Sequence, residues 1–305
     1  MSYLRDSYGQ VLVELGSQNP NIFVLTADLK TSTRCDSFAE KYPKRFVQCG
    51  IAEQNMMGVA SGLAKAGKIP IVNSFAVFNP GRNWDQLRVS VCYSNANVKI
   101  VGHHSGFSAQ GDGATHQAFE DLAITRVLPN LHILQPNSPK QVGQVIKHAV
   151  DYFGPVYIRL GGKYDISEDV DLGDFDVNKA NILKTGKDLT VVVSGVLTYF
   201  TFQAVVELKS QVDIELISFS SLKPFDQKTL IDSAKKTGKV LTIEDHQITG
   251  GLGSIVSEIL SENNPVKVFR HGIYDQFGES GSMQDLLKKY KLDKEGIKEK
   301  ILQIL

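Results

Sequence analysis

Stretches with helical hydrophobic spacing alternate with short, continuous apolar runs along most of the chain. Apolar residues recur at helical spacing from Leu4 to Leu15, Asn19 and Pro20 end that pattern, and a continuous apolar run covers residues 22–27. The same order repeats further on. Because the runs are short, rich in β-branched residues and not interrupted by polar ones, we expect parallel strands covered by helices on both faces.

The pattern predicts an alternating order of helices and strands in both halves of the chain. Strands are predicted at residues 22–27, 69–73, 98–102, 131–134, 156–160, 189–193, 214–218, 240–243 and 266–269. Helices are predicted at about residues 4–15, 51–65, 82–93, 117–128, 138–152, 199–209, 227–235 and 252–260, followed by two closing helices.

A change of composition divides the chain in two. The segment from residue 161 to residue 188 is rich in Asp, Gly and Lys, with only scattered apolar residues. A length of 305 residues also suits two domains. We therefore predict two doubly wound, mainly parallel α/β domains, at residues 1–163 and 189–305, joined by a linker at 164–188.

Charge and cysteine content exclude several classes of protein. The 33 Lys and Arg residues balance the 33 Asp and Glu residues, so no positive surplus favours binding to nucleic acid or a membrane surface. The three cysteines form no C-x-x-C pair, which is typical of a reduced protein. With no signal peptide and no apolar run of membrane-spanning length, we expect a cytoplasmic, soluble protein.

Polar and aromatic residues gather where the predicted strands of the first domain end. Ligands bind at the carboxyl ends of parallel strands, so these loops are the place to look for chemistry. The candidates are Asp28, Ser32, Glu53, Phe75, Phe78, His103, His104, Asp112, His116 and Arg159. Taken singly, each also suits a plainer role, such as a first-turn glutamate, a core phenylalanine or a loop histidine.

Two glycine motifs look functional but do not fit their context. Gly250–Gly253 opens a helix but follows a polar loop rather than a strand, so we interpret it as a helix start. Gly111-Asp112-Gly113 with Asn137 downstream resembles the metal motif of thiamine enzymes. No apolar strand precedes it, however, and we reject it as a metal site.

Taken together, the loops resemble the second half of transketolase. The strings are LTADLKTST (25–33), RFVQCGIAEQNMMGVASGLA (45–64), SFAVFNPGRNWDQLR (74–88), HHSGFSAQGDGATHQAFEDLA (103–123), VLTIEDHQITGGLGS (240–254) and IYDQFGESG (273–281). The resemblance implies a pyrimidine-binding domain followed by a C-terminal domain. It also implies a separate N-terminal subunit that holds the diphosphate of thiamine diphosphate and its Mg²⁺, in a heterotetramer built around a homodimer of this chain.

The resemblance also assigns roles at the cofactor. Glu53 matches the glutamate that bonds a pyrimidine nitrogen and so favours the imino tautomer, the form that removes the thiazolium proton. Phe78 and Phe75 match the aromatic residues that pack on the pyrimidine. Asp28 falls near the thiazolium, without a defined role. Asn79-Pro80-Gly81 departs from the family and leaves the next cofactor-facing position, before Arg82, open.

Other matching positions concern the sugar substrates. Asp112 and His116 align with residues that bind ketose hydroxyls, and we group His116 with Glu53 as catalytic. His104, Ser32 and Arg159 align with residues that grip the sugar phosphate. The resemblance implies transfer of a two-carbon ketol unit from a ketose phosphate to an aldose phosphate.

Other interpretations stay open at this point. The beta subunit of a 2-oxoacid dehydrogenase decarboxylase shares the domain pair and the glutamate, but it lacks the GDGxTHQ string. Deoxyxylulose phosphate synthase is a further relative, usually a single chain. A third interpretation is a non-catalytic scaffold or regulatory partner, which would have no need for Glu53, Asp112, His116 and Arg159 in one crevice.

Overall fold

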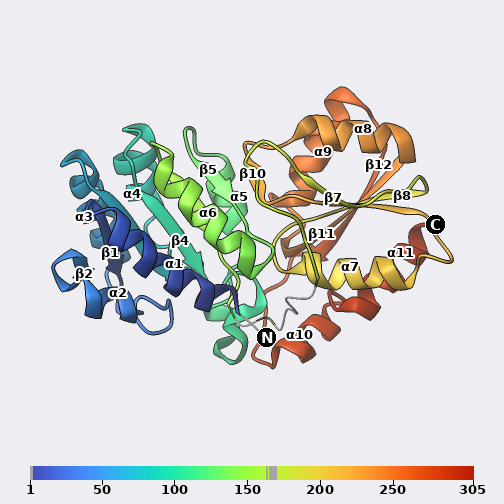
Figure 1. Cartoon of the computed structure of the whole chain (residues 1–305). Helices are drawn as coiled ribbons and strands as arrows, with labels where there is room; N and C mark the ends of the chain where they lie inside the picture. The colour runs from blue at the N-terminus through green and yellow to red at the C-terminus, as the bar shows by residue number, and fades with distance from the viewer. Residues whose placement is uncertain (1–2, 163, 165–169) are drawn as a thin grey trace.

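The computed structural model describes residues 3–162, 164 and 170–305, which form two α/β units lying side by side (Figure 1). The first unit contains α1 (Leu4–Gln18), β1 (Ile22–Thr26), α2 (Asp36–Lys41), η1 (Pro43–Arg45), β2 (Phe46–Gln48), α3 (Glu53–Lys65), β3 (Ile69–Phe75), α4 (Trp84–Gln86), η2 (Leu87–Tyr93), β4 (Lys99–His103), η3 (Phe107–Thr115), α5 (Asp121–Arg126), β5 (His132–Leu134), α6 (Pro139–Asp151) and β6 (Val156–Arg159). The rest contains β7 (Asn181–Lys184), β8 (Leu189–Val193), α7 (Leu197–Glu207), β9 (Ile214–Ser218), β10 (Ser221–Lys223), α8 (Gln227–Thr237), β11 (Lys239–Gln247), α9 (Leu252–Asn263), β12 (Lys267–Ile273), α10 (Met283–Lys289) and α11 (Lys294–Ile304).

The first sheet has the strand order β10-β5-β6-β4-β3-β1-β2. All neighbouring strands are parallel except β10, which runs antiparallel to β5. Successive residues of a strand point to opposite faces. Val24 accordingly packs in the core that includes α1 and α6, whereas Leu25 packs in the core that includes α3 and η2. Burial on both faces explains why the strands are apolar throughout.

The second sheet has the order β12-β11-β8-β9-β7, with β7 antiparallel to β9 and the other pairs parallel. Helices α7 and α11 lie on one side of it and α8 and α9 on the other (Figure 1). Val191 and Val192 again belong to opposite cores. The predicted fold class of two mainly parallel, doubly wound α/β domains is confirmed.

Short elements differ from the sequence prediction. Strands β2, β7 and β10 were not predicted, and β7 falls within residues 164–188, the expected linker. The predicted helix at 117–128 is reduced to α5, and the one at 82–93 becomes a short α4 followed by a π-helical segment. The expected boundary at residue 163, and residues 165–169 of the expected linker, lie outside the described residues.

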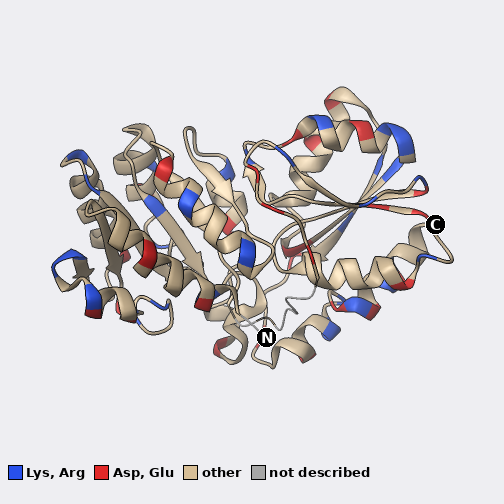
Figure 2. Ribbon diagram, viewed as in Figure 1, with Lys and Arg blue, Asp and Glu red and all other residues tan. Residues whose placement is uncertain are grey.

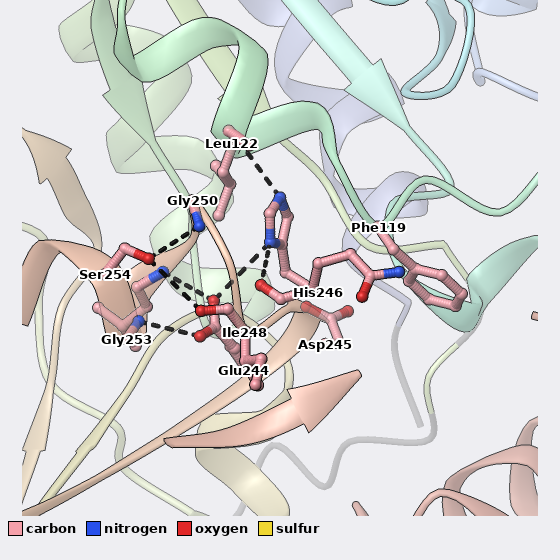
Figure 3. Close-up of polar contacts among 12 residues, drawn as sticks. Phe119, Leu122, Glu244, Asp245, His246, Ile248, Gly250, Gly253 and Ser254 are labelled. Atoms are coloured by element: carbon pink, nitrogen blue, oxygen red, sulfur yellow. Dashed lines mark hydrogen bonds and ion pairs between the residues drawn. The ribbon is translucent and has the colours of Figure 1, made fainter. Parts of the chain in front are cut away.

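The start of α9 confirms our interpretation of Gly250–Gly253. The carboxylate of Glu244 accepts hydrogen bonds from the backbone N–H groups of Leu252 (2.7 Å) and Gly253 (2.9 Å) (Figure 3). These amides would be unsatisfied at a helix N-terminus without such a partner. The glycines therefore form a helix entry that a side chain of the protein itself caps.

Charge is spread over the molecule. In the view of Figure 2, Lys and Arg residues and Asp and Glu residues are scattered over both units. Among the described residues, no helix combines the length and the apolar character needed to cross a membrane.

Candidate active site

Glu53 opens helix α3 and is buried at the carboxyl edge of the first sheet. Only 1% of the residue is exposed. Its Oε1 accepts a hydrogen bond from the hydroxyl of Ser74 at 3.3 Å, near the end of β3. Its Oε2 lies 2.9 Å from Nη1 of Arg82. A buried carboxylate is costly without such partners, so its position is strongly defined.

Arg82 joins Glu53 to the aromatic part of the site. Its guanidinium lies over the ring of Phe78, with the central carbon 4.5 Å from the ring centroid. Nearly half of the Arg82 side chain, 46%, is exposed to solvent. The ion pair with Glu53 and the cation–π contact with Phe78 therefore meet at one side chain that can move outward.

The predicted aromatic and histidine residues form one cluster. The rings of Phe75 and Phe78 are parallel, with centroids 6.3 Å apart. His104 lies 4.2 Å from Phe75, and His116 lies 5.3 Å from Phe78 and 6.1 Å from Phe75. The end of β3 and the loops that follow β3 and β4 thus bring together Phe75, Phe78, His104 and His116. Arg82 links this cluster to Glu53 at the start of α3.

The departure at Asn79-Pro80-Gly81 forms a tight, well-bonded turn. The buried amide of Asn79 donates to the carbonyl oxygens of Val72 (3.4 Å) and Val101 (3.2 Å). A side chain at Gly81 would place its Cβ 2.0 Å from the carbonyl oxygen of Val77, so only glycine fits. The turn fixes Phe78 on one side and Arg82 on the other.

A buried arginine that the sequence did not single out reaches the histidines. Arg5 of α1 is 7% exposed and places Nη1 3.4 Å from Nε2 of His104. Its Nε has no hydrogen-bond partner within the described part of the chain. Burial, and then the charge of Arg34, lower the pKa of Arg5. A guanidinium held in this way suits an anion such as a phosphate.

Next to His104, His103 belongs to a polar network beneath the site. Its Nε2 lies 3.1 Å from Oδ1 of Asn73, which also accepts a hydrogen bond from the hydroxyl of Tyr8. Burial, reinforced by His104 and Arg5, holds the pKa of His103 well below its ordinary value. His103 is therefore neutral and donates its Nε2 proton to Asn73.

The structure corrects our expectation for Arg159. This residue is 1% exposed, and its guanidinium pairs with Asp121 (Nε–Oδ2, 2.9 Å) and Asp245 (Nη1–Oδ1, 2.5 Å). Its Nη2 donates to the backbone carbonyls of Ala118 and Asp245. Because these partners take its donors inside the protein, Arg159 is an internal ion-pair residue and does not face a sugar phosphate here.

Three predicted residues lie in the right loops but outside the cluster. Asp28 and Ser32 follow β1, and Asp112 lies in the loop after β4. Within the described part of the chain, no direct hydrogen bond, ion pair or ring contact joins them to the cluster. Asp112 is connected to His116 through the hydroxyl of Thr115, which donates to the carbonyl oxygen of Asp112 (3.4 Å) and lies 2.8 Å from Nδ1 of His116. Asp28 instead exchanges hydrogen bonds with Gln48 at the end of β2.

The residues that sequence reasoning missed are Ser74, Arg82 and Arg5. Ser74 directly precedes the predicted Phe75, and Arg82 follows the predicted Phe78 by four residues, so their position was a usable signal. Arg5 had none, because an arginine in the first turn of a helix is ordinarily solvent-exposed. Among the described residues, no group of three or more His, Cys, Asp or Glu side chains could hold a metal ion.

Comparisons with known proteins agree with this architecture. The family model described as "Transketolase, pyrimidine binding domain" matches residues 2–163, and "Transketolase, C-terminal domain" matches residues 178–297. The chain is 40% identical over 304 residues to a Methanocaldococcus jannaschii protein provisionally described as a transketolase C-terminal section, covering 98% of this chain and 95% of that protein.

Two further relatives are similar over nearly their full length. One of the subunits of an apulose-4-phosphate transketolase from Phocaeicola vulgatus is 38% identical, over 96% of this chain and 94% of that protein. A solved structure described as a split-gene transketolase in an inactive β4 tetramer has a TM-score of 0.86 and 43% identity, covering 99% of this chain and 97% of that chain. The chain therefore belongs to the transketolase family, of which it contains the pyrimidine-binding and C-terminal domains.

Proposed function

We propose that this chain is the C-terminal subunit of a two-chain transketolase that moves a two-carbon ketol unit from a ketose phosphate to an aldose phosphate. The observation that carries the proposal is the buried carboxylate of Glu53, which Arg82 links to Phe78 and thereby to His116. The family depends on thiamine diphosphate, which supplies the carbon nucleophile that takes up the two-carbon unit.

The residues present fit the pyrimidine ring of that cofactor. Glu53 offers a buried carboxylate that can hydrogen-bond a ring nitrogen, and Phe78 offers a ring face for stacking. Arg82 contacts both Glu53 and Phe78 at once. We propose that Glu53 holds a proton at the pyrimidine nitrogen and that Arg82 moves outward to admit the ring.

The histidines and Arg5 fit the sugar substrates. We propose that His116 and Asp112 bind ketose hydroxyls, and that Arg5, His104 and Ser32 bind the phosphate. The buried Nε of Arg5, which has no hydrogen-bond partner among the described residues and lies 4.0 Å from Oδ1 of Asp6, supports an anion at this place. Relatives such as the apulose-4-phosphate enzyme indicate that the sugar differs among split transketolases. We propose that the partner subunit holds the diphosphate and Mg²⁺.

The test is to assemble the chain with its N-terminal partner, thiamine diphosphate and Mg²⁺, and to assay ketol transfer with a panel of ketose and aldose phosphates. We expect activity that Glu53→Gln lowers by about 100-fold or more, because a positioned acid–base group contributes about that much. Glu40→Gln, at an exposed site in α2, is the matched control.

Three results would contradict the proposal. Undiminished turnover in Glu53→Gln would remove its catalytic role. Release of CO₂ from pyruvate without ketol transfer would favour the 2-oxoacid decarboxylase alternative, and absence of cofactor binding by the assembled complex would favour a scaffold.

A further inference from the structure

The loop that carries Asp112 and His116 has an irregular backbone. Residues 106–117, here called the substrate loop, connect β4 to the segment before α5. Gly106, Gln110 and Gly113 all have positive φ angles, of 60°, 50° and 71°. Such conformations persist only where the surroundings enforce them, most clearly at the non-glycine residue Gln110.

At its start, the substrate loop lies against β11 of the second unit. A Cβ atom at Gly106 would lie 2.1 Å from Oδ2 of Asp245. Asp245 is itself held by Nη1 of Arg159 and by the hydroxyl of Tyr164, which donates to Oδ2 at 3.1 Å. The buried ion pair of Arg159 thus fixes a carboxylate of the second unit against the first glycine of the loop.

The segment at 277–281 of the second unit contacts the other end of the loop. The buried side chain of Gln117 donates through Nε2 to the carbonyl oxygen of Glu279 (2.9 Å) and to that of Gln110 (3.4 Å). A Cβ atom at Gly113 would lie 2.6 Å from Oγ of Ser280, and one at Gly278 would lie 1.7 Å from Oε1 of Gln117. The two segments are therefore in close contact.

The chain that follows the loop is bonded to β11 as well. The backbone N–H of Gln247 donates to the carbonyl oxygen of Phe119 at 2.8 Å, and Nε2 of His246 accepts from the N–H of Ala123 at 3.4 Å. Figure 3 shows Asp245 and His246 beside Phe119. The second unit therefore contacts the loop at its start, near its end and just beyond it.

From these contacts we infer that the C-terminal domain positions the substrate loop, with Gln117 as the positioning residue that ties the loop to the segment 277–281. Among the described residues, Gln117 makes no hydrogen bond to the proposed cofactor-binding residues Glu53, Phe75 and Phe78. It acts through the backbone of Gln110 and through its neighbour His116. The inference rests on the proposed function, because it assumes that His116 and Asp112 bind the sugar.

Two variants break the same contact from opposite sides. Gln117→Met keeps the volume of the side chain but removes its hydrogen bonds to Glu279 and Gln110. Gly278→Ala leaves Gln117 in place but puts a methyl group where its amide oxygen lies. Gly278 does not have a positive φ angle, so alanine causes no backbone strain of its own.

Lys223→Met is the matched control. Lys223 also donates two hydrogen bonds to backbone carbonyls, those of Arg126 (3.0 Å) and Leu128 (2.5 Å). It therefore ties residues of the second half of the chain to the first unit, but away from the substrate loop.

In the assembled enzyme we expect Gln117→Met and Gly278→Ala to raise the KM for the sugar phosphates about tenfold, the effect of losing a hydrogen bond or two. The kcat of these two variants should change less, and their apparent affinity for thiamine diphosphate should stay within about twofold of wild type. In Lys223→Met, the KM, the kcat and this affinity should all stay within about twofold of wild type. Unchanged KM values in both folded variants, or a loss confined to cofactor affinity, would overturn the inference. A wild-type complex without ketol transfer would instead refute the proposed function, and that assay comes first.

Discussion

At the scale of single residues, the site is defined by how its few charges are compensated. Glu53 is buried against one cation, Arg82, which is itself half-exposed. Arg159 is buried between two carboxylates. The positions of Glu53 and Arg159 in the chain were sufficient to predict both as site residues. What the sequence could not supply was the partner of each side chain, and for Arg159 the partners decide that it is structural.

The pairing of Glu53 with Arg82 leads to a prediction about the free subunit. Arg82→Gln leaves a buried carboxylate without its ion-pair partner, so we expect the free energy of unfolding to fall by about 1–2 kcal/mol. In the Glu53→Gln background, Arg82→Gln should lower the free energy of unfolding much less, because no carboxylate charge remains that needs a partner. Urea unfolding of wild type, the two single variants and the double variant measures this coupling energy.

Arg88→Gln, at an exposed position in η2, serves as the control for the loss of a positive charge. If Arg82→Gln destabilises the Glu53→Gln background as much as the wild type, the ion pair contributes nothing and Arg82 acts through Phe78 alone.

At the scale of elements, the sequence indicated the long strands and helices well because their periodicity is strong. It missed β2, β7 and β10, which have three or four residues, too few for a pattern. It extended α5 to residue 117, although the backbone there is fixed by the bond from Gln117 to Glu279, a contact across 162 residues. Contacts of that range leave no local signature.

Strand β4 begins with a buried lysine, Lys99, whose role could not be predicted from the sequence either. Nζ of Lys99 donates to the carbonyl oxygens of Tyr152 and Gly154 and to Oδ1 of Asn97, each at 2.7 Å. These bonds fasten the start of β4 to the end of α6. Burial lowers the pKa of Lys99 from 10.5 to about 7.

The lowered pKa predicts that stability rises with pH. Between about pH 7 and 10.5, the unfolded chain carries a proton on Lys99 that the folded chain lacks, so raising the pH favours folding in this window. Below pH 7 both states are charged and the cost of burying the charge is fully present. From pH 7 to pH 9 the stability of wild type relative to Lys99→Met should therefore rise by about 2 kcal/mol.

Urea unfolding of both proteins at the two pH values measures the change, and Lys147→Met, at an exposed position on α6, controls for the loss of a lysine. The neighbouring His132 and His148 have pKa values lowered chiefly by burial and do not titrate in this window. A difference between wild type and Lys99→Met that stays constant with pH would contradict the prediction.

At the scale of the whole molecule, the two domains pack against each other and together hold the site in place. Cores on both sides of the two sheets draw residues from both domains, and β10 adds a strand from the second half of the chain to the first sheet. The residues that we propose to face the cofactor nevertheless all lie in the first domain, which matches the pyrimidine-binding domain of the family. This arrangement sets how tightly the chain can bind that cofactor by itself.

We therefore predict weak binding of thiamine diphosphate by the isolated chain and a gain of at least about 100-fold on assembly with the N-terminal partner in the presence of Mg²⁺. Stacking on Phe78 and one hydrogen bond to Glu53 are together worth about 1–4 kcal/mol, too little to offset the loss of freedom on binding. Isothermal titration calorimetry of the chain, the partner and the complex measures the gain. Glu53→Gln should weaken binding of thiamine diphosphate to the complex about tenfold. Sedimentation should show that this variant still assembles with the partner. Tight binding by the isolated chain would show that this polypeptide also holds the diphosphate, and the site would then not be divided between two subunits.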